Sequence, residues 1–298
     1  MTRITRILIA NRGEIAVRIM RTARSMGINC VAIRTAAEPD ALYLSMADII
    51  HSEEDELAEI PVFLDVEKLI GIALTTECNA IHPGYGFLSE NAYFAEKCRD
   101  NGIIFIGPSP DAIYKMGNKP VARQIALKHR IPMAMGSTGS VANEEEALSQ
   151  AARIGYPVII KAASGGGGRG MRVVRQESDM ERMFILASRE AEKAFNDPGV
   201  FIEKYIENPK HIEFQILGDT HGNIIHLGER ECSIQRKHQK LLEEAPSPAL
   251  NEELRRRMGE TAVRIARAVG YYSAGTVEFL LDSDHNFYFM EMNTRIQV

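Results

Sequence analysis

Hydrophobic and polar positions in the first third of the chain repeat a strand–helix–strand pattern. The apolar run RILIA at 6–10 predicts a short strand, and apolar residues then recur every three or four positions as far as Gly27, which predicts a helix. The run NCVAI at 29–33 predicts the next strand. The pattern returns at 79–106, with a helix predicted over about 90–99. Because parallel sheets are built from such units, we expect an open α/β layer here.

After a mainly helical stretch at 108–132, the pattern changes from parallel units to hairpins. We expect helices at 144–153 and about 178–195, around two strands that flank a glycine-rich run. Two antiparallel hairpins follow, HIEFQILG with NIIHLGERE and GTVEFLL with NFYFMEMN, and Asn251 is the predicted N-cap of the helix between them. The sequence therefore predicts an α/β parallel-sheet layer followed by an α+β domain.

The last eight residues alternate strictly between two kinds of side chain. Since side chains in a strand alternate between two faces, this predicts a strand that runs to the end of the chain. One face is polar and is the candidate functional face: Glu291, Asn293, Arg295 and Gln297. The other face carries Met292, Thr294, Ile296 and Val298.

Composition narrows the class of protein. Of the 298 residues, 45% are hydrophobic and 25% charged, which is ordinary for a globular protein. The net charge of -5 argues against nucleic-acid binding. The chain contains no stretch of 18 apolar residues, so the sequence predicts no membrane span. The first strand begins at Arg6, which leaves no room for a signal peptide. Four scattered cysteines without a C-x-x-C pair predict reduced, mostly buried thiols and a cytoplasmic location.

A glycine-rich loop at 163–170 is the first candidate for chemistry. Its sequence formally satisfies G-x-G-x-x-G, but it leads from one strand into another strand, MRVV, rather than into a helix. We therefore expect a hairpin flap whose backbone N–H groups approach phosphate, with Lys161 on the strand that enters it adding a charge. The alternative is a flexible surface turn. A protein kinase is excluded, because the lysine precedes the loop and neither H-R-D nor D-F-G occurs. A dinucleotide site at 10–14 is also disfavoured, because ANRGE holds one glycine.

Two glutamates interrupt the strands of the second hairpin. An antiparallel pairing around Asp284 would set Glu278 roughly opposite Glu291. Two adjacent carboxylates favour a cation, and Mg²⁺ prefers oxygen ligands such as these, with Asn293 as a neutral third. Arg295 continues this face and could hold a second anion. The alternative is a pair of ordinary exposed glutamates at a sheet edge.

The charged run ERECSIQRKHQK at 229–240 has two interpretations. Such runs are usually solvated, but this one leaves a hairpin strand, so we interpret it as a loop between the hairpins that lines the site. Gln235, His238 and Lys240 could then contact nucleotide hydroxyls or an anionic co-substrate. His211, at the start of the first hairpin, is either a structural histidine or a nucleotide contact.

Together these segments resemble the biotin carboxylases, which are ATP-grasp enzymes. The resemblance runs from about Arg6 to Val298 and is carried by ANRGEIAVRI, HPGYGFLSEN, GGGGRGMRVV, IEKYIENPKHIEFQ, ERECSIQRKHQK, EEAPSP and FMEMNTRIQV. It implies a biotin carboxylase N-terminal domain at 1–113 and an ATP-grasp domain at 114–298, with a lid at about 132–204. It also implies an activity: ATP- and bicarbonate-dependent carboxylation, through carboxyphosphate, of biotin on a biotin carboxyl carrier protein. A carboxyltransferase would be the second partner, and the full-length form would be a homodimer.

The resemblance also assigns roles to individual residues. Catalytic roles fall to Arg295 and Lys240, and the Mg²⁺ or Mn²⁺ ligands would be Glu278, Glu291 and Asn293. ATP binding would involve Lys119, Lys161, Gly165, Gly166, Gly167, Gly168, Glu203, Lys204, Ile206, His211, Gln235 and His238. The bicarbonate pocket would be formed by Lys240, Arg295, Gln297 and Val298. Tyr43, where the family has histidine, and Ser164, where it has glycine, depart from the pattern.

Two rival functions stay open from the residues. Another ATP-grasp ligase would keep the flap and the carboxylates but lose ERECSIQRKHQK and NTRIQV, both of which are present. A non-catalytic nucleotide-binding module is the second rival. The acyl acceptor of the parent carboxylase, whether acetyl-CoA, a related acyl-CoA or pyruvate, is chosen by a separate transferase, so this chain does not specify it.

In the family the motif NTRIQV continues into a glutamate that acts as a base, which lies beyond Val298. We therefore expect the 298-residue chain to be an N-terminal part of the enzyme that binds ATP weakly and does not carboxylate biotin. The measurement is bicarbonate-dependent ATP cleavage with free biotin, and robust turnover would contradict the expectation.

Overall fold

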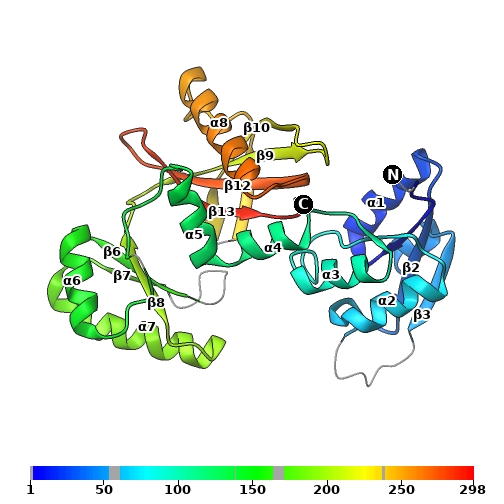
Figure 1. Ribbon diagram of the computed structural model, residues 1–298, viewed down its shortest axis with the longest axis horizontal. Helices are drawn as coiled ribbons and strands as arrows, with labels where there is room; N and C mark the ends of the chain where they lie inside the picture. Colours follow the sequence, from blue (N-terminus) through cyan, green and yellow to red (C-terminus); the bar gives the residue numbers. More distant parts are fainter. Residues whose placement is uncertain (1–2, 54–60, 138, 164–170, 237–238) are drawn as a thin grey trace.

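The computed structural model describes residues 3–53, 61–137, 139–163, 171–236 and 239–298. Within these residues three sheets organise the chain (Figure 1). The N-terminal sheet has the order β3-β2-β1-β4-β5, the small sheet β7-β6-β8, and the central sheet β11-β10-β9-β12-β13. A parallel layer followed by antiparallel sheets is the fold class that the sequence predicts.

The N-terminal sheet is parallel throughout and buries both faces. Its strands are β1 (Arg6–Ile9), β2 (Asn29–Thr35), β3 (Ile49–Glu53), β4 (Ala80–His82) and β5 (Ile104–Phe105). Helix α1 (Gly13–Ser25) covers one face, and α2 (Val66–Thr75) and α3 (Ala92–Asp100) cover the other. Because side chains alternate along β1, Leu8 packs with α2 and α3 while Ile7 and Ile9 pack with α1. Short 3₁₀ turns lie at Leu42–Met46 and Val62–Leu64.

Two short helices link this layer to the central sheet. Helix α4 (Pro110–Gly117) is capped by Ser109, and α5 (Lys119–Lys128) is capped by Asn118, each through a side-chain oxygen that accepts a backbone N–H three residues on. A proline in the first turn of each helix needs no hydrogen-bond partner there. Capping by Asn118 fixes Lys119 at the start of α5, where the chain leaves the N-terminal layer.

The central sheet presents one apolar and one polar face. Its strands are β9 (Lys210–Gly218), β10 (Ile224–Arg236), β11 (Gln239–Glu244), β12 (Ser273–Leu281) and β13 (Phe287–Asn293). Helix α8 (Glu252–Ala268) covers the apolar face, and its predicted N-cap is confirmed, since Asn251 accepts from Leu254 N at 2.9 Å. Phe279 is fully buried there, with edge-to-face contacts to Phe214 and Phe287.

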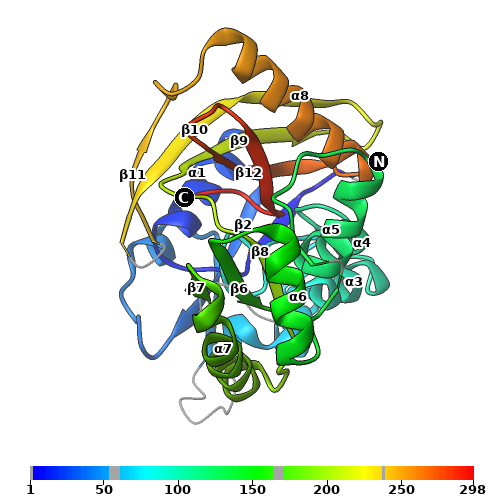
Figure 2. The ribbon, with the colours of Figure 1, turned by 90° about the vertical axis from the view of Figure 1, so that its left-hand side faces the viewer.

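The small sheet forms a body with its own core. It contains β6 (Val158–Ala162), β7 (Arg172–Val174) and β8 (Val200–Lys204), packed against α6 (Glu144–Ile154) and α7 (Met180–Phe195) (Figure 2). A 3₁₀ turn at Glu177–Asp179 precedes α7. The buried cluster contains residues of this body alone, from Val141 to Ile202.

Two predictions about the strands are wrong. Residues 229–236, predicted as part of a loop, belong to β10, which continues to Arg236 and pairs with β11, setting Gln235 opposite Lys240. The final strand ends at Asn293 rather than at the end of the chain, because the backbone N–H of Thr294 donates to the side chain of Glu90 instead of to a neighbouring strand.

The state of the cysteines matches the prediction from the sequence. All four cysteines are buried free thiols, as predicted. Burial raises the pKa of Cys98 and of Cys232 to about 12. Among the helices of the described residues, none is both long and apolar enough to cross a bilayer.

Phe279 offers a test of the central core. Phe279→Ala removes a fully buried ring from the aromatic cluster, so we expect a loss of about 3–5 kcal/mol in the free energy of unfolding. Urea denaturation followed by circular dichroism measures it. Leu227→Ala, at a site that is 61% exposed on β10, is the control and should change stability by about 0.5 kcal/mol or less. Equal effects of the two substitutions would contradict this description of the core.

Candidate functional site

The polar face of the central sheet is assembled by strand register. Glu278 of β12 lies opposite Glu213 of β9 on one side and opposite Glu291 of β13 on the other. Residues that face each other across antiparallel strands project from the same face, so these three carboxylates share the face away from α8. The prediction that Glu278 and Glu291 lie opposite each other is confirmed.

Glu278 is the centre of this face. It is 3% exposed, and its carboxylate contacts His211 Nε2 at 2.8 Å, Lys240 Nζ at 2.9 Å and Asn293 Nδ2 at 2.6 Å. Burial would raise the pKa of Glu278, but the hydrogen bond from His211, followed by the charge and hydrogen bond of Lys240, outweighs it and lowers the pKa to about 2. Glu278 is therefore an anion at neutral pH.

His211 has a defined tautomer. Gln235 Nε2 donates to the carbonyl of Cys232 at 2.8 Å and also contacts His211 Nδ1 at 2.6 Å. Because a carbonyl can only accept, Gln235 presents its NH₂ group, so Nδ1 accepts and the Nε2–H of a neutral ring donates to Glu278. Both nitrogens of this buried ring are thus satisfied within the protein.

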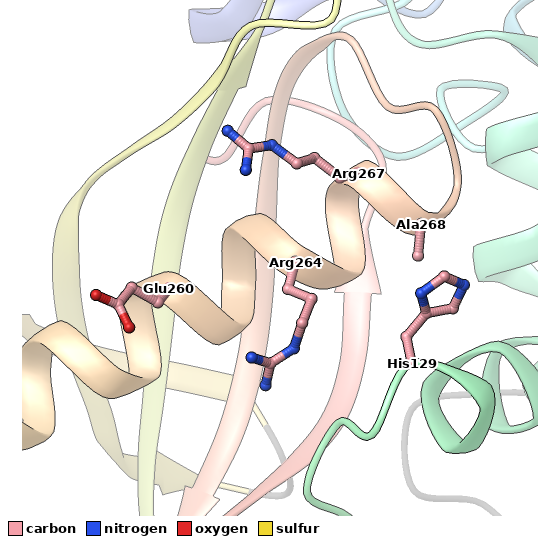
Figure 3. Close-up of a pocket in the computed structure, with 5 residues that line it drawn as sticks. All are labelled: His129, Glu260, Arg264, Arg267 and Ala268. Atoms are coloured by element: carbon pink, nitrogen blue, oxygen red, sulfur yellow. The ribbon is translucent and has the colours of Figure 1, made fainter.

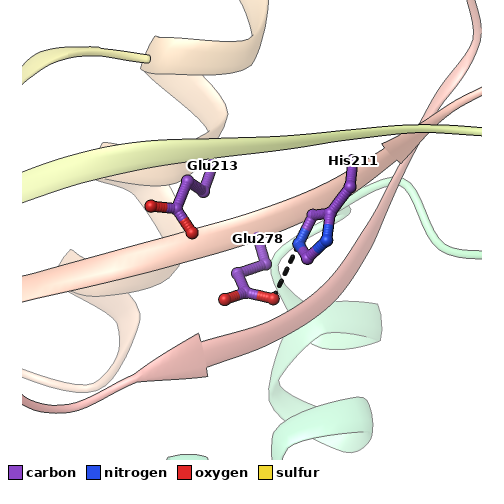
Figure 4. A group of neighbouring side chains, drawn as sticks. All are labelled: His211, Glu213 and Glu278. Carbon is purple, nitrogen blue, oxygen red and sulfur yellow. Dashed lines mark hydrogen bonds and ion pairs between the residues drawn. The ribbon is translucent and has the colours of Figure 1, made fainter. Parts of the chain in front are cut away.

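Lys240 lies between two carboxylates. Figure 4 shows Glu213 and Glu278 side by side with His211, and their ligand atoms lie within 4.8 Å of one another. The Lys240 ammonium bonds both carboxylates, and Arg230 Nε bonds Glu213 at 2.5 Å. Burial would lower the pKa of Lys240, but Glu278 and Glu213 outweigh it and raise that pKa. The cluster is therefore an ion-paired network in which a lysine supplies the cation.

Glu291 differs from Glu278 because no cation in this network is bonded to it. Partial burial of the carboxylate, followed by the negative charge of Glu278, raises the pKa of Glu291. The residue as a whole is still exposed to water. The positive charge of Lys119 opposes this shift. An excess of negative charge beside Glu278 favours a bound cation at this point.

Arg295 is held by a residue of the N-terminal layer. Glu90 Oε2 accepts from Arg295 Nε at 3.0 Å, and its Oε1 accepts from Thr294 N at 2.9 Å. The guanidinium also donates to Asn293 Oδ1 at 3.1 Å and to Gln297 Oε1 at 3.0 Å. Since Asn293 in turn donates to Glu278, a continuous chain of hydrogen bonds joins Gln235 to Gln297.

A second group of predicted residues gathers around Glu203 at the end of β8. Lys161 Nζ bonds Glu203 Oε2 at 2.6 Å, and Arg123 Nη1 bonds Oε1 at 2.9 Å. Burial would raise the pKa of Glu203, but Lys161, then Arg123 and Lys119, outweigh it and keep it low. Burial, together with the like charge of Lys161, lowers the pKa of Lys119. Lys204 instead donates to the carbonyls of Gly155 and Tyr156 at 3.0 Å.

Two further predicted residues fall within the described residues. Ile206 is half-buried just beyond β8, and Val298 is 86% exposed. Gly165, Gly166, Gly167, Gly168 and His238 lie outside the described residues.

Sequence reasoning missed three residues that hold the site together. Glu213 follows His211 by two positions, so strand alternation could have placed it on the same face. Arg230 lies in the charged run, but its pairing with Glu213 depends on register. Glu90 contacts Thr294 and Arg295, which are more than 200 positions away in the sequence, and the pattern of this sequence gives no signal for such a contact.

A separate hollow outside α8 does not form a comparable site. It has a volume of about 400 Å³ and is lined by His129, Glu260, Arg264, Arg267 and Ala268. Figure 3 shows Arg264 and Arg267 pointing in different directions from the helix. Glu260 is paired with Arg256 at 2.8 Å. The polar groups do not converge on one point, so we assign no ligand to it.

The donor set on the polar face fits a hard divalent cation. Glu278, Glu291 and the amide oxygen of Asn293 are oxygen ligands, which Mg²⁺ and Mn²⁺ accept. Glu278 and Glu291 lie on paired positions of β12 and β13, so a cation between their carboxylates would offset the repulsion between them. The amide oxygen of Asn293 accepts from Arg295, so a metal would share or displace that contact.

Comparison with known proteins identifies the class to which this arrangement belongs. Residues 3–113 match the family model for the biotin carboxylase N-terminal domain, and residues 118–298 match that for the ATP-binding domain of the carbamoyl-phosphate synthase L chain. A biotin carboxylase from Nostoc sp. is 55% identical over 98% of this chain, which spans 65% of that relative.

Solved structures agree. A biotin carboxylase from Campylobacter jejuni, described as a β-γ-ATP complex, matches with a TM-score of 0.92 and 50% identity over 99% of this chain and 66% of its own. The biotin carboxylase domain dimer of a Hydrogenobacter thermophilus 2-oxoglutarate carboxylase, with MgADP, ADP and bicarbonate, matches with a TM-score of 0.92 and 48% identity, over 100% of this chain and 65% of its own. The chain therefore belongs to the biotin carboxylase family.

His82, which with Arg295 lines a small hollow of about 50 Å³, gives a pH test. Burial, followed by the charge of Arg18, lowers the pKa of His82 from 6.5 to about 4. The unfolded chain binds a proton at a higher pH than the folded chain, so stability is lost as pH falls from about 6.5 towards 4. His82 Nδ1 accepts from Gly84 N at 3.0 Å, a role that an asparagine oxygen can fill.

We therefore expect His82→Asn to flatten the dependence of the unfolding free energy on pH in this window by about 1 kcal/mol per pH unit. Urea denaturation at several pH values measures it. His129→Asn is the control, and an unchanged slope in the His82 variant would count against a lowered pKa of His82.

Proposed function

We propose that this chain supplies the nucleotide and bicarbonate sites of a biotin carboxylase, which uses ATP and bicarbonate to carboxylate biotin on a biotin carboxyl carrier protein. The observation that supports this most directly is the pairing of Glu278 with Glu291 across β12 and β13. The charge of Lys119 acts on Glu291 and on Glu203, and Lys161 bonds Glu203. Two acids for a metal and two lysines for phosphates fit a metal–nucleotide complex.

Bicarbonate is a poor nucleophile, so positioning and charge neutralisation must lower the barrier. Lys119 and Lys161 would neutralise the phosphates of ATP, while Glu278, Glu291 and Asn293 would hold Mg²⁺ or Mn²⁺. The bound cation would neutralise charge on the phosphate oxygens. Glu203 and Ile206 would border the adenine, and Gln235 and His211 the ribose.

Arg295 and Lys240 are the proposed catalytic pair. Arg295 uses four of its five N–H groups in the contacts described here, with Glu90, Asn293, Gln297 and the carbonyl of Ile296. Lys240 uses two of three, with Glu213 and Glu278. The donors left over would hold bicarbonate beside Gln297 and the backbone of Val298, and Arg295 would also stabilise the enolate of biotin.

The wider assignments are also proposals. We place the boundary between an N-terminal domain and an ATP-grasp domain near 113–114, with the lid at about 132–204. The parent enzyme would be a homodimer that works with a carrier protein and a carboxyltransferase, in the first half-reaction of an acetyl-CoA, related acyl-CoA or pyruvate carboxylase. A cytoplasmic location stays a prediction from composition.

Substitution of Glu291 tests the metal site. We expect Glu291→Gln to weaken binding of ATP in the presence of Mg²⁺ by about tenfold or more, because one of two charged ligands is lost. Isothermal titration calorimetry with ATP, with Mg²⁺ and with EDTA, measures it. Glu253→Gln, on the first turn of α8, is the matched control. Equal affinities of wild type and Glu291→Gln with Mg²⁺ would argue against this ligand.

A further inference from the structure

Two segments connect the small-sheet body to the rest of the chain, and they run side by side. The incoming segment passes through Met135 and Ser137, and the outgoing one is the end of β8. Ser137 N donates to Ile202 O at 2.7 Å, and Lys204 N donates to Met135 O at 2.7 Å. The connection is therefore a two-stranded ribbon rather than two independent loops, and we call these segments, 133–137 and 201–205, the connector.

One side chain from the other body reaches both strands of the connector. Arg123 lies on α5, whose Ala122 and Ala126 are buried in the core of the central sheet. Its Nη1 bonds Glu203 Oε1 at 2.9 Å, and its Nη2 donates to Ala134 O at 3.4 Å. The guanidinium thus ties the incoming and the outgoing strand to α5.

The connector is shaped to admit this guanidinium. A Cβ on Gly136 would lie 2.7 Å from Arg123 Nη2 and 3.0 Å from Glu203 Cγ, and both contacts are too short. The absence of a side chain at this position leaves room for Arg123. The ion pair is also largely shielded, since the side chain of Arg123 is 19% exposed and that of Glu203 is 20% exposed.

The two oxygens of Glu203 serve different cations. Arg123 holds Oε1, while Lys161, the proposed phosphate ligand, holds Oε2 at 2.6 Å. Lys161 gives one of its three N–H donors to Glu203, so Glu203 and a phosphate compete for the position of its ammonium, and a poorly solvated carboxylate with no other cation would hold it more tightly. With Arg123 in place, Glu203 keeps a counter-ion when Lys161 turns away.

We propose that Arg123 is a positioning residue for the nucleoside triphosphate site: it anchors the connector through Glu203 and frees Lys161 for phosphate. This rests on the proposed function, because Lys161 is taken there as a phosphate ligand. Arg123 does not contact the nucleotide in this scheme, and its effect passes through Glu203.

Calorimetry of the 298-residue chain with ATP and Mg²⁺ tests the effect on binding. We expect Arg123→Met to weaken ATP binding by about tenfold, because Glu203 then competes for Lys161. In a Glu203→Gln background that competition is absent, so Arg123→Met should change affinity by less than about threefold relative to Glu203→Gln alone. A merely structural role of Arg123 would weaken binding equally in both backgrounds. Lys128→Met, on the same helix and exposed, is the control for loss of one positive charge.

Hydrogen exchange without nucleotide tests the connector on its own. We expect the amides of Ser137 and Lys204 to exchange about tenfold faster in Arg123→Met than in wild type or Lys128→Met. Unchanged exchange, or an equal loss of affinity with and without Glu203→Gln, would overturn the proposal. Failure of the wild-type chain to bind ATP would refute the proposed function and with it the role of Lys161. In that case the exchange experiment would still decide whether Arg123 anchors the connector.

Discussion

The ammonium of Lys240 makes the polar face of the central sheet possible. It bonds Glu213 and Glu278, two neighbouring carboxylates of which one is completely buried and the other 3% exposed. Removing such groups from water costs several kcal/mol per ion unless a cation and hydrogen bonds compensate. This requirement explains the long β10–β11 hairpin, because pairing Gln235 with Lys240 brings the lysine back over β9 and β12.

The orientation of the other polar groups follows from the ion pair between Lys240 and Glu278. With Glu278 fixed as an anion, His211 must present an N–H and Asn293 must present its NH₂ group. The oxygen of Asn293 then faces Arg295, whose guanidinium is a donor on every edge. Side chains from β9, β10, β11, β12 and the segment after β13 are thereby ordered before any ligand binds, which is the arrangement that electrostatic catalysis requires.

Much of the fold followed from local pattern, whereas contacts between distant segments did not. The helical and strand periods predicted β1, α1, α8 and the β12–β13 hairpin, and the hairpin geometry was sufficient to set Glu278 opposite Glu291. Strand β11, with the sequence QKLLEE, has no clear alternation and was not predicted, and its first two residues fell in the run that was interpreted as a loop. The end of β13 was also missed, because a carboxylate of the N-terminal layer ends it. Local sequence carries no information on such pairings, which depend on how separate layers dock.

The contact between Glu90 and Arg295 has a consequence for how the protein can change. A single carboxylate of the first layer orients the guanidinium that the second layer contributes, through Nε and through the backbone of Thr294. The two layers are consequently not interchangeable modules. Consider a chimera that joins the first layer of one homologue to the second layer of another. Arg295 keeps its orientation in such a chimera only if the first layer supplies an acid at the position of Glu90, on a loop that fits the second layer.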